Sequence, residues 1–209
     1  MIRQLTLFDA GEQTLVDDAR GRITYESGFI DASTAATWFA ELRENVAWRT
    51  ERRTMYDREV DVPRLLGHYR LDSPPPDTPA AILDAVRRVA AAVGAPFNSV
   101  GLNLYRDGRD SVAPHNDHLD EIRRGFPIAL LSLGATRRMT IRAKEPPRRT
   151  LHVDLEPGSL FVMDYATQLH YTHGIPKTDA VVGERISLAF RVKRPRDGWK
   201  VAGVREACG

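Results

Sequence analysis

The sequence predicts an α+β protein in which helices pack against a β-sandwich of the jelly-roll or barrel type. Apolar residues recur at helical spacing in the first half of the chain, and from about residue 99 they alternate with polar residues instead. Turn residues separate the short alternating segments. A chain of 209 residues, of which 42% are hydrophobic, is sufficient for one compact domain with a core.

Two helices are predicted before residue 99. The first begins at Asp31, a residue type that caps helix N-termini, and continues through Leu42. The second covers Pro79 to Val93, with Thr78 as its capping residue and Gly94 at its end. A stiff loop with three consecutive prolines precedes the second helix, because proline is excluded from helix interiors.

Seven short strands are predicted after these helices. Each is rich in aliphatic or β-branched residues and is bounded by turn residues such as Gly, Pro and Asp. The strands cover residues 99–105, 127–133, 138–144, 150–155, 159–164, 169–173 and 185–192. Their number and spacing are typical of a jelly-roll or a barrel.

The composition excludes several classes of protein. No apolar run approaches the roughly 18–20 residues that cross a membrane, and the start of the chain lacks the apolar segment of a secretory signal. We therefore expect a cytoplasmic protein without a membrane segment. The one cysteine, Cys208, cannot form an internal disulfide bond or a thiolate cluster for zinc. Any bound metal must therefore be held by His and carboxylate side chains.

A pair of candidate metal ligands lies at His115 and Asp117. In an extended segment residues i and i+2 point to the same side, so both side chains can contact one cation. His173, in a later predicted strand, is the best candidate for a third ligand. Two His and one carboxylate are the ligand set of non-haem Fe(II) oxygenases. The pair alone is a common pattern, and a surface turn with two polar residues is the alternative.

The last predicted strand carries two arginines, Arg185 and Arg191. They are six residues apart and therefore lie on the same face of the strand. If Ile186, Leu188 and Phe190 on the other face fill the hydrophobic layer, the arginines line a polar cavity. Such arginines bind a dicarboxylic acid through paired hydrogen bonds. The alternative is an exposed edge strand whose arginines are solvated.

Four segments resemble the AlkB family of Fe(II)- and 2-oxoglutarate-dependent dioxygenases. They are NLYRDGRDSVAPHND, PIALLSLGATRRMTIR, LEPGSLFVMDYATQLHYTHGIP and RISLAFR, and they follow the order of the family within residues 60–193. The run SLGATR before a basic strand is more similar to the DNA-repair demethylase branch than to the founding bacterial enzyme. The resemblance implies a double-stranded β-helix (jelly-roll) core with supporting N-terminal helices and a substrate-lid segment.

The resemblance also implies a division of the chain into four parts. Residues 1–30 are expected to form an N-terminal arm, and residues 31–98 the helical support and nucleotide-recognition lid. Residues 99–195 are expected to form the dioxygenase core, followed by a tail at residues 196–209. The metal and cosubstrate residues therefore fall in the core, and most of the substrate contacts fall in the lid.

The resemblance assigns a role to each residue that matches a family motif. The implied iron ligands are His115, Asp117 and His173, and the implied 2-oxoglutarate-binding residues are Asn103, Tyr105, Arg185, Ser187 and Arg191. The implied reaction is oxidative demethylation of N-alkylated bases in DNA, or in RNA, with Fe(II), O₂ and 2-oxoglutarate. Succinate, CO₂ and formaldehyde are its further products.

Substrate-binding residues are also expected from the resemblance. Arg64 belongs to a Val-Pro-Arg element that is similar to the substrate lid. Tyr56, eight residues before Arg64 and preceded by Met55, lies about where relatives that repair duplexes fill the gap left by a flipped base. For both residues an exposed loop pair or a helix-packing contact is the alternative. Tyr69 lines the base pocket or belongs to the core.

Basic charge is concentrated toward the end of the chain. Residues 126–209 carry 14 Lys and Arg against 8 Asp and Glu, whereas the whole chain has a net charge of +2. The densest segment, residues 137–149, contains Arg137, Arg138 and Arg142. Such a segment suits an anionic partner, and we expect it to contact the phosphates of alkylated single- or double-stranded DNA, or of RNA. The protein itself is expected to be a monomer.

Two features on the substrate side depart from the family pattern. Leu119 stands where the repair enzymes carry an acidic residue that contacts the damaged base, and Asp120 and Glu121 follow as candidate replacements. A Pro-rich stretch at residues 70–79 replaces a lid segment that contains Gly and aromatic residues. A 2-oxoglutarate-dependent hydroxylase of a small molecule, lipid or protein side chain is therefore the alternative function. A non-catalytic nucleic-acid-binding module that retains the fold is the third.

Overall fold

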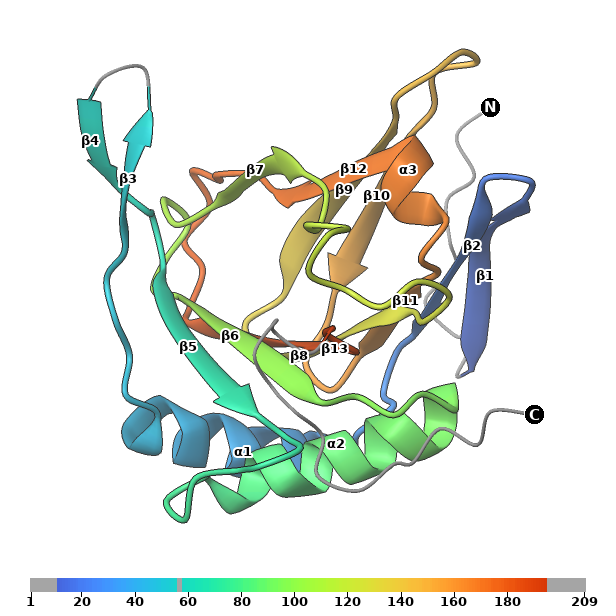
Figure 1. The fold of residues 1–209 in the computed structure, drawn as a ribbon. Helices are drawn as coiled ribbons and strands as arrows, with labels where there is room; N and C mark the ends of the chain where they lie inside the picture. Colours follow the sequence, from blue (N-terminus) through green and yellow to red (C-terminus); the bar gives the residue numbers. More distant parts are fainter. Residues whose placement is uncertain (1–10, 56–57, 195–209) are drawn as a thin grey trace, which may run out of the picture.

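The computed structural model describes residues 11–55 and 58–194 of the chain. Two antiparallel sheets lie face to face, and two long helices cover the outer face of the larger sheet (Figure 1). This arrangement confirms the predicted α+β jelly-roll with supporting helices. None of the described helices is long and apolar enough to cross a membrane.

The strands form two main sheets and a separate ribbon. The larger sheet contains, in spatial order, β1 (Glu12–Asp18), β2 (Gly21–Glu26), β11 (Leu160–Met163), β8 (Ile128–Gly134), β13 (Arg185–Arg191), β6 (Ser99–Tyr105) and β5 (Leu65–Arg70). The smaller sheet contains β10 (Thr150–Leu155), β9 (Arg137–Ala143), β12 (Tyr171–Ile175) and β7 (Val112–His115). The ribbon consists of β3 (Arg52–Met55) and β4 (Arg58–Asp61).

Two apolar layers hold these elements together. One lies between the larger sheet and the helices α1 (Ala32–Asn45) and α2 (Ala80–Val93), and its buried members include Leu42, Ile82, Val89 and Leu131. The other lies between the two sheets, and its buried members include Ile23, Met139, Ile141 and Phe161. The second layer leaves room on one side for a cavity between the sheets.

Alternation along β13 separates a side that faces the helices from a side that faces the cavity. Ile186, Leu188 and Phe190 are buried in the layer beneath the helices. Arg185 and Arg191 point the other way, and both line the cavity between the sheets. The structure therefore confirms that the two arginines share the face opposite the apolar residues.

The two predicted helices are present, with one difference in capping. Asp31 caps α1, because its Oδ1 accepts a hydrogen bond from the Thr34 backbone N–H at 2.9 Å. α2 ends at Gly94, whose φ of 69° is adopted most readily by glycine. The predicted capping role of Thr78 is wrong, because its hydroxyl donates to the Pro75 carbonyl at 2.7 Å.

Three segments differ from the predicted organisation. β1 and β2 lie in the segment expected to be an arm, and they extend the larger sheet instead. The strands β3, β4 and β5 lie in the segment expected to form the helical support and nucleotide-recognition lid, and β5 joins the larger sheet before the predicted core boundary at residue 99. The short helix α3 (Thr167–His170) occupies the start of the predicted strand 169–173. β2 and β5 pair with strands that are distant in the sequence, and this pairing outweighs their local preference.

Candidate active site

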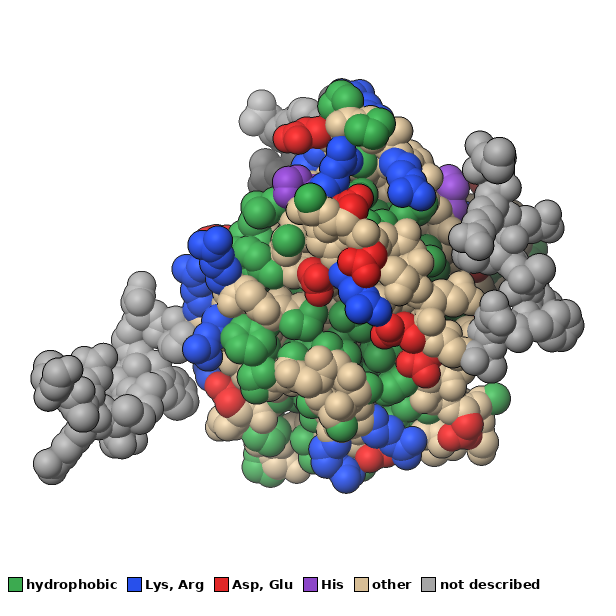
Figure 2. Space-filling view, turned by 90° about the vertical axis from the view of Figure 1, so that its right-hand side faces the viewer, with side chains coloured by type: hydrophobic (Ala, Val, Ile, Leu, Met, Phe, Trp, Pro, Cys, Tyr) green, Lys and Arg blue, Asp and Glu red, His purple; other side chains and the backbone are tan. Residues whose placement is uncertain are grey.

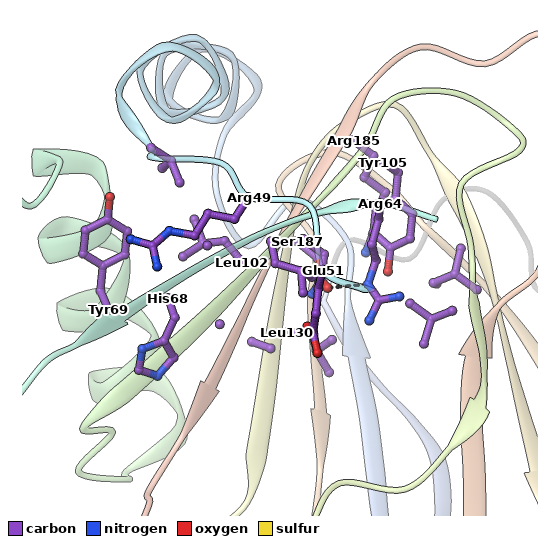
Figure 3. Close-up of a pocket in the computed structure, with 18 of the residues that line it drawn as sticks. Arg49, Glu51, Arg64, His68, Tyr69, Leu102, Tyr105, Leu130, Arg185 and Ser187 are labelled. Carbon is purple, nitrogen blue, oxygen red and sulfur yellow. Dashed lines mark hydrogen bonds between the residues drawn. The ribbon is translucent and has the colours of Figure 1, made fainter. Parts of the chain in front are cut away.

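A cavity of about 740 Å³ lies between the two sheets and extends outward past β5. Its inner part is lined by residues of β6, β7, β12 and β13. Its outer part is lined by β5 and by residues 46–51, which connect α1 with β3. Figure 3 shows the two ends, with Tyr69 and Arg49 at one and Tyr105 and Arg185 at the other. The volume is typical of a small-molecule site.

Three candidate metal ligands converge on the wall formed by the smaller sheet. His115 ends β7, Asp117 follows two residues later, and His173 lies on β12. In the antiparallel pair of β7 and β12, His115 is opposite His173, which places the two ring centroids 4.5 Å apart. One ligand atom from each of the three residues lies within 4.8 Å of the other two. Imidazole and carboxylate donors at this spacing fit one divalent cation such as Fe(II).

The two histidines are held in the neutral form that binds metals. His173 is 6% exposed, and burial together with the neighbouring His115 lowers its pKa to about 3. Burial also lowers the pKa of His115. Because the Nδ1 of His115 lies 3.0 Å from the Ala113 carbonyl oxygen, we assign its proton to Nδ1. The Nε2 atom of His115 is then available as a metal ligand.

Asp117 is held through both its side chain and its backbone. Arg191 donates to both carboxylate oxygens, each at 2.9 Å. Burial acts to raise the pKa of Asp117, but the charge and hydrogen bonds of Arg191 outweigh burial and lower it below its ordinary value. The backbone N–H of Asp117 donates to the Oε1 of the buried Gln168 at 3.1 Å. The carboxylate is therefore ionised and fixed in orientation.

A buried cation with unpaired donors lies at the other end of the inner cavity. Arg185 is 1% exposed and donates through Nη2 to the Ser132 hydroxyl at 2.8 Å. Its Nε and Nη1 have no hydrogen-bond partner within residues 11–55 and 58–194. Unpaired donors on a buried guanidinium fit a carboxylate, which accepts charge-assisted hydrogen bonds. The donor set therefore fits a dicarboxylate such as 2-oxoglutarate.

The remaining predicted cosubstrate residues line the same inner part. Asn103 and Ser187 are opposite each other in the β6–β13 pair, and Asn103 Nδ2 donates to the Ser187 hydroxyl at 3.4 Å. The Tyr105 ring centroid lies 5.1 Å from the guanidinium carbon of Arg185. Arg64 Nε donates to Asn103 Oδ1 at 2.7 Å. The arginine predicted for the substrate lid thus also contacts the cosubstrate side.

The outer part of the cavity contains polar and aromatic side chains. Tyr69 lies beside Arg49, and His68, its neighbour in β5, points to the other side of the strand (Figure 3). Tyr69 also packs against the layer beneath the helices, so it serves both the cavity and the core. Burial, and then the charge of Asp77, raises the pKa of Tyr69. The phenol therefore stays protonated at neutral pH.

The β3–β4 ribbon rises above the beginning of β5 (Figure 1). Met55 is the last residue of β3, and its side chain lies outside the described part of the structure. Tyr56 lies outside the described residues altogether. Glu51, which directly precedes β3, lines the outer cavity, so the ribbon begins at this site.

The region after Asp117 does not supply an acidic group to the large cavity. Leu119 packs against the apolar layer between the sheets. Asp120 is exposed, and Glu121 forms an ion pair with a lysine at 2.9 Å. Neither carboxylate lines the large cavity, whose described acidic residues are Glu51 and Asp77.

The three arginines expected to contact phosphates have different environments. Arg137 is 3% exposed and donates to three backbone carbonyls, so the phosphate contact expected for it is wrong. Arg138 is exposed and forms an ion pair with Asp154 at 2.8 Å. Arg142 is exposed and pairs with no acidic residue in the described part of the chain. Figure 2 shows basic and acidic side chains interspersed over the coloured part of one face, so the basic excess forms no single broad surface there.

Three supporting residues were not predicted from the sequence. Ser132, the partner of Arg185, is a polar residue inside an otherwise apolar strand. A lone polar residue in such a strand is the sequence feature from which a buried polar contact could have been predicted. Gln168, the partner of Asp117, lies on the short helix that was not predicted. Glu51 reaches the cavity from a connection that has no distinctive local pattern.

The ligand set and the buried arginine together define a class of protein, a jelly-roll oxygenase that uses Fe(II) and an anionic cosubstrate. The sequence model of the 2OG-Fe(II) oxygenase superfamily matches residues 22–191. The chain is 31% identical over 191 residues to alpha-ketoglutarate-dependent dioxygenase alkB homolog 3 of Bos taurus, covering 83% of this chain and 67% of the relative. It is 38% identical over 127 residues to DNA oxidative demethylase ALKBH2 of Bos taurus, covering 57% of this chain and 45% of the relative. The chain therefore belongs to the AlkB family of Fe(II)- and 2-oxoglutarate-dependent dioxygenases.

Solved structures share the fold at low sequence identity. An oxidoreductase of the 2OG-Fe(II) oxygenase family from Burkholderia pseudomallei superposes with a TM-score of 0.56 at 15% identity, covering 81% of this chain and 84% of that one. The structure of OsALKBH1 superposes with a TM-score of 0.55 at 14% identity, covering 84% of this chain and 99% of that one. At this identity the superpositions establish the jelly-roll fold alone.

Proposed function

We propose that this dioxygenase demethylates N-alkylated bases in nucleic acid, with DNA as the first candidate substrate and RNA as the second. The observation that carries the proposal is a single cavity lined by His115, His173 and Arg185, with Asp117 within 4.8 Å of both histidines and with unpaired donors on Arg185. The same cavity continues outward to exposed polar and aromatic residues, which leaves a place for a substrate. Similarity to proteins named DNA oxidative demethylases supports a nucleic-acid substrate.

In this proposal the inner residues hold the cofactor and the cosubstrate. His115, Asp117 and His173 bind Fe(II), and Arg185 binds the far carboxylate of 2-oxoglutarate. With O₂, bound Fe(II) and 2-oxoglutarate would supply hydroxylation of an N-methyl carbon, after which that carbon leaves as formaldehyde. Arg191 keeps the metal-binding carboxylate ionised and oriented. The neutral histidines and one carboxylate leave a positive charge on the bound metal, which suits an anionic cosubstrate.

Apolar side chains separate the cosubstrate site from bulk water. Leu130, Met139 and Ile175 are buried, and they line the cavity between the sheets. In a cavity of low polarity the charged contacts to a bound anion are stronger than in water. These residues therefore favour an enclosed reaction over release of reactive species to solvent.

The outer cavity suits a positively charged base. Alkylation of a ring nitrogen of adenine or cytosine gives the base a positive charge at neutral pH. Glu51 and Asp77 bring carboxylates to this part of the cavity, and Tyr69 brings an aromatic ring. Carboxylates attract such a base, and an aromatic ring stabilises a cation above its face. We assign recognition of the charged base to these residues in place of the acidic residue that is replaced by Leu119.

Two hairpins suit contacts with the nucleic-acid backbone. The β3–β4 and β9–β10 hairpins project toward the same side of the core (Figure 1). Arg142 on β9 and Arg148 and Arg149 before β10 are exposed. We assign phosphate contacts to these three arginines rather than to the buried Arg137.

The proposal is tested with a short single-stranded DNA that carries one N1-methyladenine, and with the matching RNA. Each is incubated with the protein, Fe(II), 2-oxoglutarate and O₂, and its mass is measured. We expect the DNA to lose one CH₂ unit with the wild-type protein and with His152→Ala, an exposed histidine outside the cavity. His115→Ala is expected to abolish the change, because it removes one of the three candidate ligands.

Two outcomes would contradict parts of the proposal. Conversion of 2-oxoglutarate to succinate without any change in DNA or RNA would favour a hydroxylase of a small molecule, lipid or protein side chain. A mass change in RNA but not in DNA would make RNA the substrate. The salt dependence of substrate binding separates these cases further, because only a nucleic acid gives a steep dependence through counterion release.

A further inference from the structure

Arg137 is a buried cation that neither the cosubstrate contacts nor the nucleic-acid surface explains. It is the first residue of β9, it is 3% exposed, and it does not line the cavity. Burying a guanidinium costs free energy unless its donors are paired. The partners of Arg137 therefore indicate what this buried charge stabilises.

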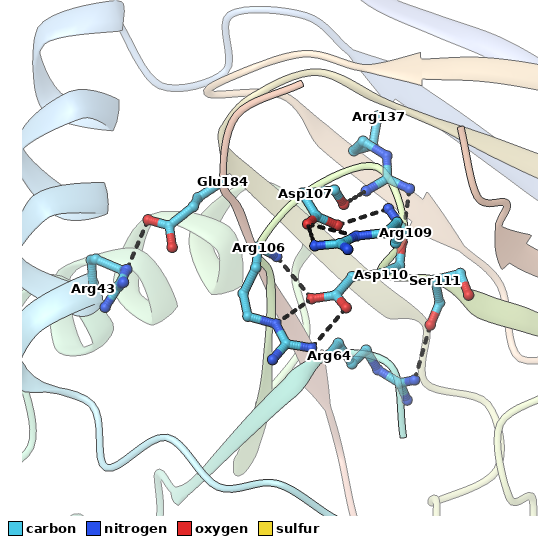
Figure 4. Close-up of polar contacts among 9 residues, drawn as sticks. All are labelled: Arg43, Arg64, Arg106, Asp107, Arg109, Asp110, Ser111, Arg137 and Glu184. Atoms are coloured by element: carbon cyan, nitrogen blue, oxygen red, sulfur yellow. Dashed lines mark hydrogen bonds and ion pairs between the residues drawn. The ribbon is translucent and has the colours of Figure 1, made fainter. Parts of the chain in front are cut away.

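The partners of Arg137 are the backbone carbonyls of two loops. Nη1 donates to the Asp107 carbonyl at 2.9 Å, and Nη2 donates to the carbonyls of Asp110 at 2.9 Å and Pro176 at 2.8 Å. Asp107 and Asp110, drawn in Figure 4, lie between β6 and β7. Pro176 directly follows β12. Arg137 thus joins the loop that precedes one histidine of the metal cluster to the loop that follows the other.

The loop between β6 and β7 is also braced from within. Arg106 forms an ion pair with Asp110 at 2.8 Å, and Arg109 forms one with Asp107 at 2.6 Å (Figure 4). A Cβ at Gly108 would lie 2.3 Å from a backbone carbonyl oxygen of the loop after β12. The two loops are therefore packed closely together, and Arg137 donates to both.

Arg137 also contacts the aromatic ring at the inner end of the cavity. The Tyr105 ring centroid lies 5.6 Å from the guanidinium carbon of Arg137 and 5.1 Å from that of Arg185. Tyr105 lines the cavity, whereas Arg137 lies behind it. Contacts between a cation and an aromatic face stabilise the ring where water is excluded. The orientation of Tyr105, next to the unpaired donors of Arg185, therefore depends on Arg137.

We propose that Arg137 is a positioning residue for 2-oxoglutarate, which holds Tyr105 and the β6–β7 loop so that Arg185 meets the far carboxylate. The proposal depends on 2-oxoglutarate as cosubstrate and not on which alkylated substrate the enzyme takes. A second buried guanidinium at this end of the cavity also makes the local potential more positive, which favours a doubly charged acid over a singly charged one.

The test measures the affinity of the Mn(II)-loaded protein for 2-oxoglutarate by isothermal titration calorimetry. Arg137→Met removes the charge and the hydrogen bonds, and Arg137→Lys keeps the charge but lacks the forked donor that reaches three carbonyls. We expect both variants to bind 2-oxoglutarate roughly 10-fold more weakly or worse, as for loss of an outer partner at a metal site. Arg138→Met, which changes an exposed residue on the opposite face of the same strand, is expected to retain the wild-type affinity.

A merely structural role for Arg137 gives a different result. It lowers the melting temperature but leaves the affinity for 2-oxoglutarate unchanged at temperatures where the variant is folded, and this outcome overturns the proposal. A second readout compares 2-oxoglutarate with 2-oxobutyrate, which lacks the far carboxylate. We expect the Arg137 variants to lose affinity for the dicarboxylate only, whereas an equal loss for both acids overturns the proposal. If Arg137→Met does not fold, the same two measurements on Arg137→Lys decide the question.

Discussion

Replacing Arg185 by Met is expected to stabilise the unliganded protein while abolishing its response to 2-oxoglutarate. Arg185 is 1% exposed, and its Nε and Nη1 have no partner among the described residues. These atoms carry about three N–H donors, and each unsatisfied buried donor costs about 1–3 kcal/mol. The hydrogen bond to Ser132 and the contact with Tyr105, which Met cannot make, are together worth about 2–5 kcal/mol. The midpoints of these two contributions, about 6 and about 3.5 kcal/mol, differ by about 2.5 kcal/mol, so we expect a net gain of about 1–4 kcal/mol in the free energy of unfolding.

Thermal unfolding measures both halves of this prediction. For a domain of this size about 1 kcal/mol corresponds to a shift of roughly 2–4 °C in melting temperature, so the unliganded variant is expected to melt about 2–16 °C above the wild type. Saturation of the Mn(II)-loaded wild type with 2-oxoglutarate at about 100 times its Kd adds about 2.7 kcal/mol of stability. The Arg185→Met variant is expected to gain nothing from the same addition.

Ser132→Ala is the matched control, because it keeps Arg185 but removes its hydrogen-bond acceptor. It is expected to destabilise the unliganded protein by about 1–3 kcal/mol and to retain a response to 2-oxoglutarate. A lower melting temperature for unliganded Arg185→Met would refute the reasoning, since the buried guanidinium would then stabilise the fold. A retained response of that variant to 2-oxoglutarate would show that another residue binds the far carboxylate.

Three further predictions concern the metal cluster, the β6–β7 loop and the nucleic-acid surface. A Cβ at Gly174 would lie 2.7 Å from the Val112 carbonyl oxygen, so Gly174→Ala is expected to separate β12 from β7. We expect a titration to show Mn(II) binding weakened roughly 10-fold, and unchanged binding would contradict this. Burial acts to raise the pKa of Asp110, but hydrogen bonds from Arg106 lower it overall. Asp110→Asn should therefore reduce the free energy of unfolding, measured in urea at pH 7. The difference in stability between wild type and variant should disappear as the pH falls below about 3.9 and through the pKa of Asp110 in the folded protein. Arg142→Gln is expected to reduce the slope of log K against log salt for single-stranded DNA by about 0.7, whereas an unchanged slope would exclude a phosphate contact.

The shared face of Arg185 and Arg191 could be predicted because it follows from alternation along one strand, whereas Asn103, Tyr105 and Ser187 were expected from the family resemblance. Arg185 and Arg191 lie on one face of β13 and the apolar residues lie on the other, as a period of two requires. The register of β6 against β13 places Asn103 opposite Ser187. These relations hold within one strand or one antiparallel pair, so the sequence contains most of the information that determines them.

The same alternation explains why Arg137 is buried although its neighbour Arg138 is exposed. Arg137 and Arg138 are consecutive residues of β9, so their side chains must point to opposite faces of the sheet. Which of the two is buried depends on the carbonyls of loops around residues 107–110 and 176, and those partners come from other parts of the chain.

The proposed substrate half of the site is assembled from segments that no local pattern connects. Glu51 precedes β3, Tyr69 lies on the edge strand β5, and Asp77 belongs to the Pro-rich stretch before α2. None of these residues shares a register with the metal cluster, whereas His115 and His173 are opposite each other in one strand pair. The outer residues can therefore change without disturbing the strands that hold the metal and cosubstrate ligands. For this reason the departures at Leu119 and in the Pro-rich stretch bear on which substrate is bound and leave the oxygenase chemistry intact.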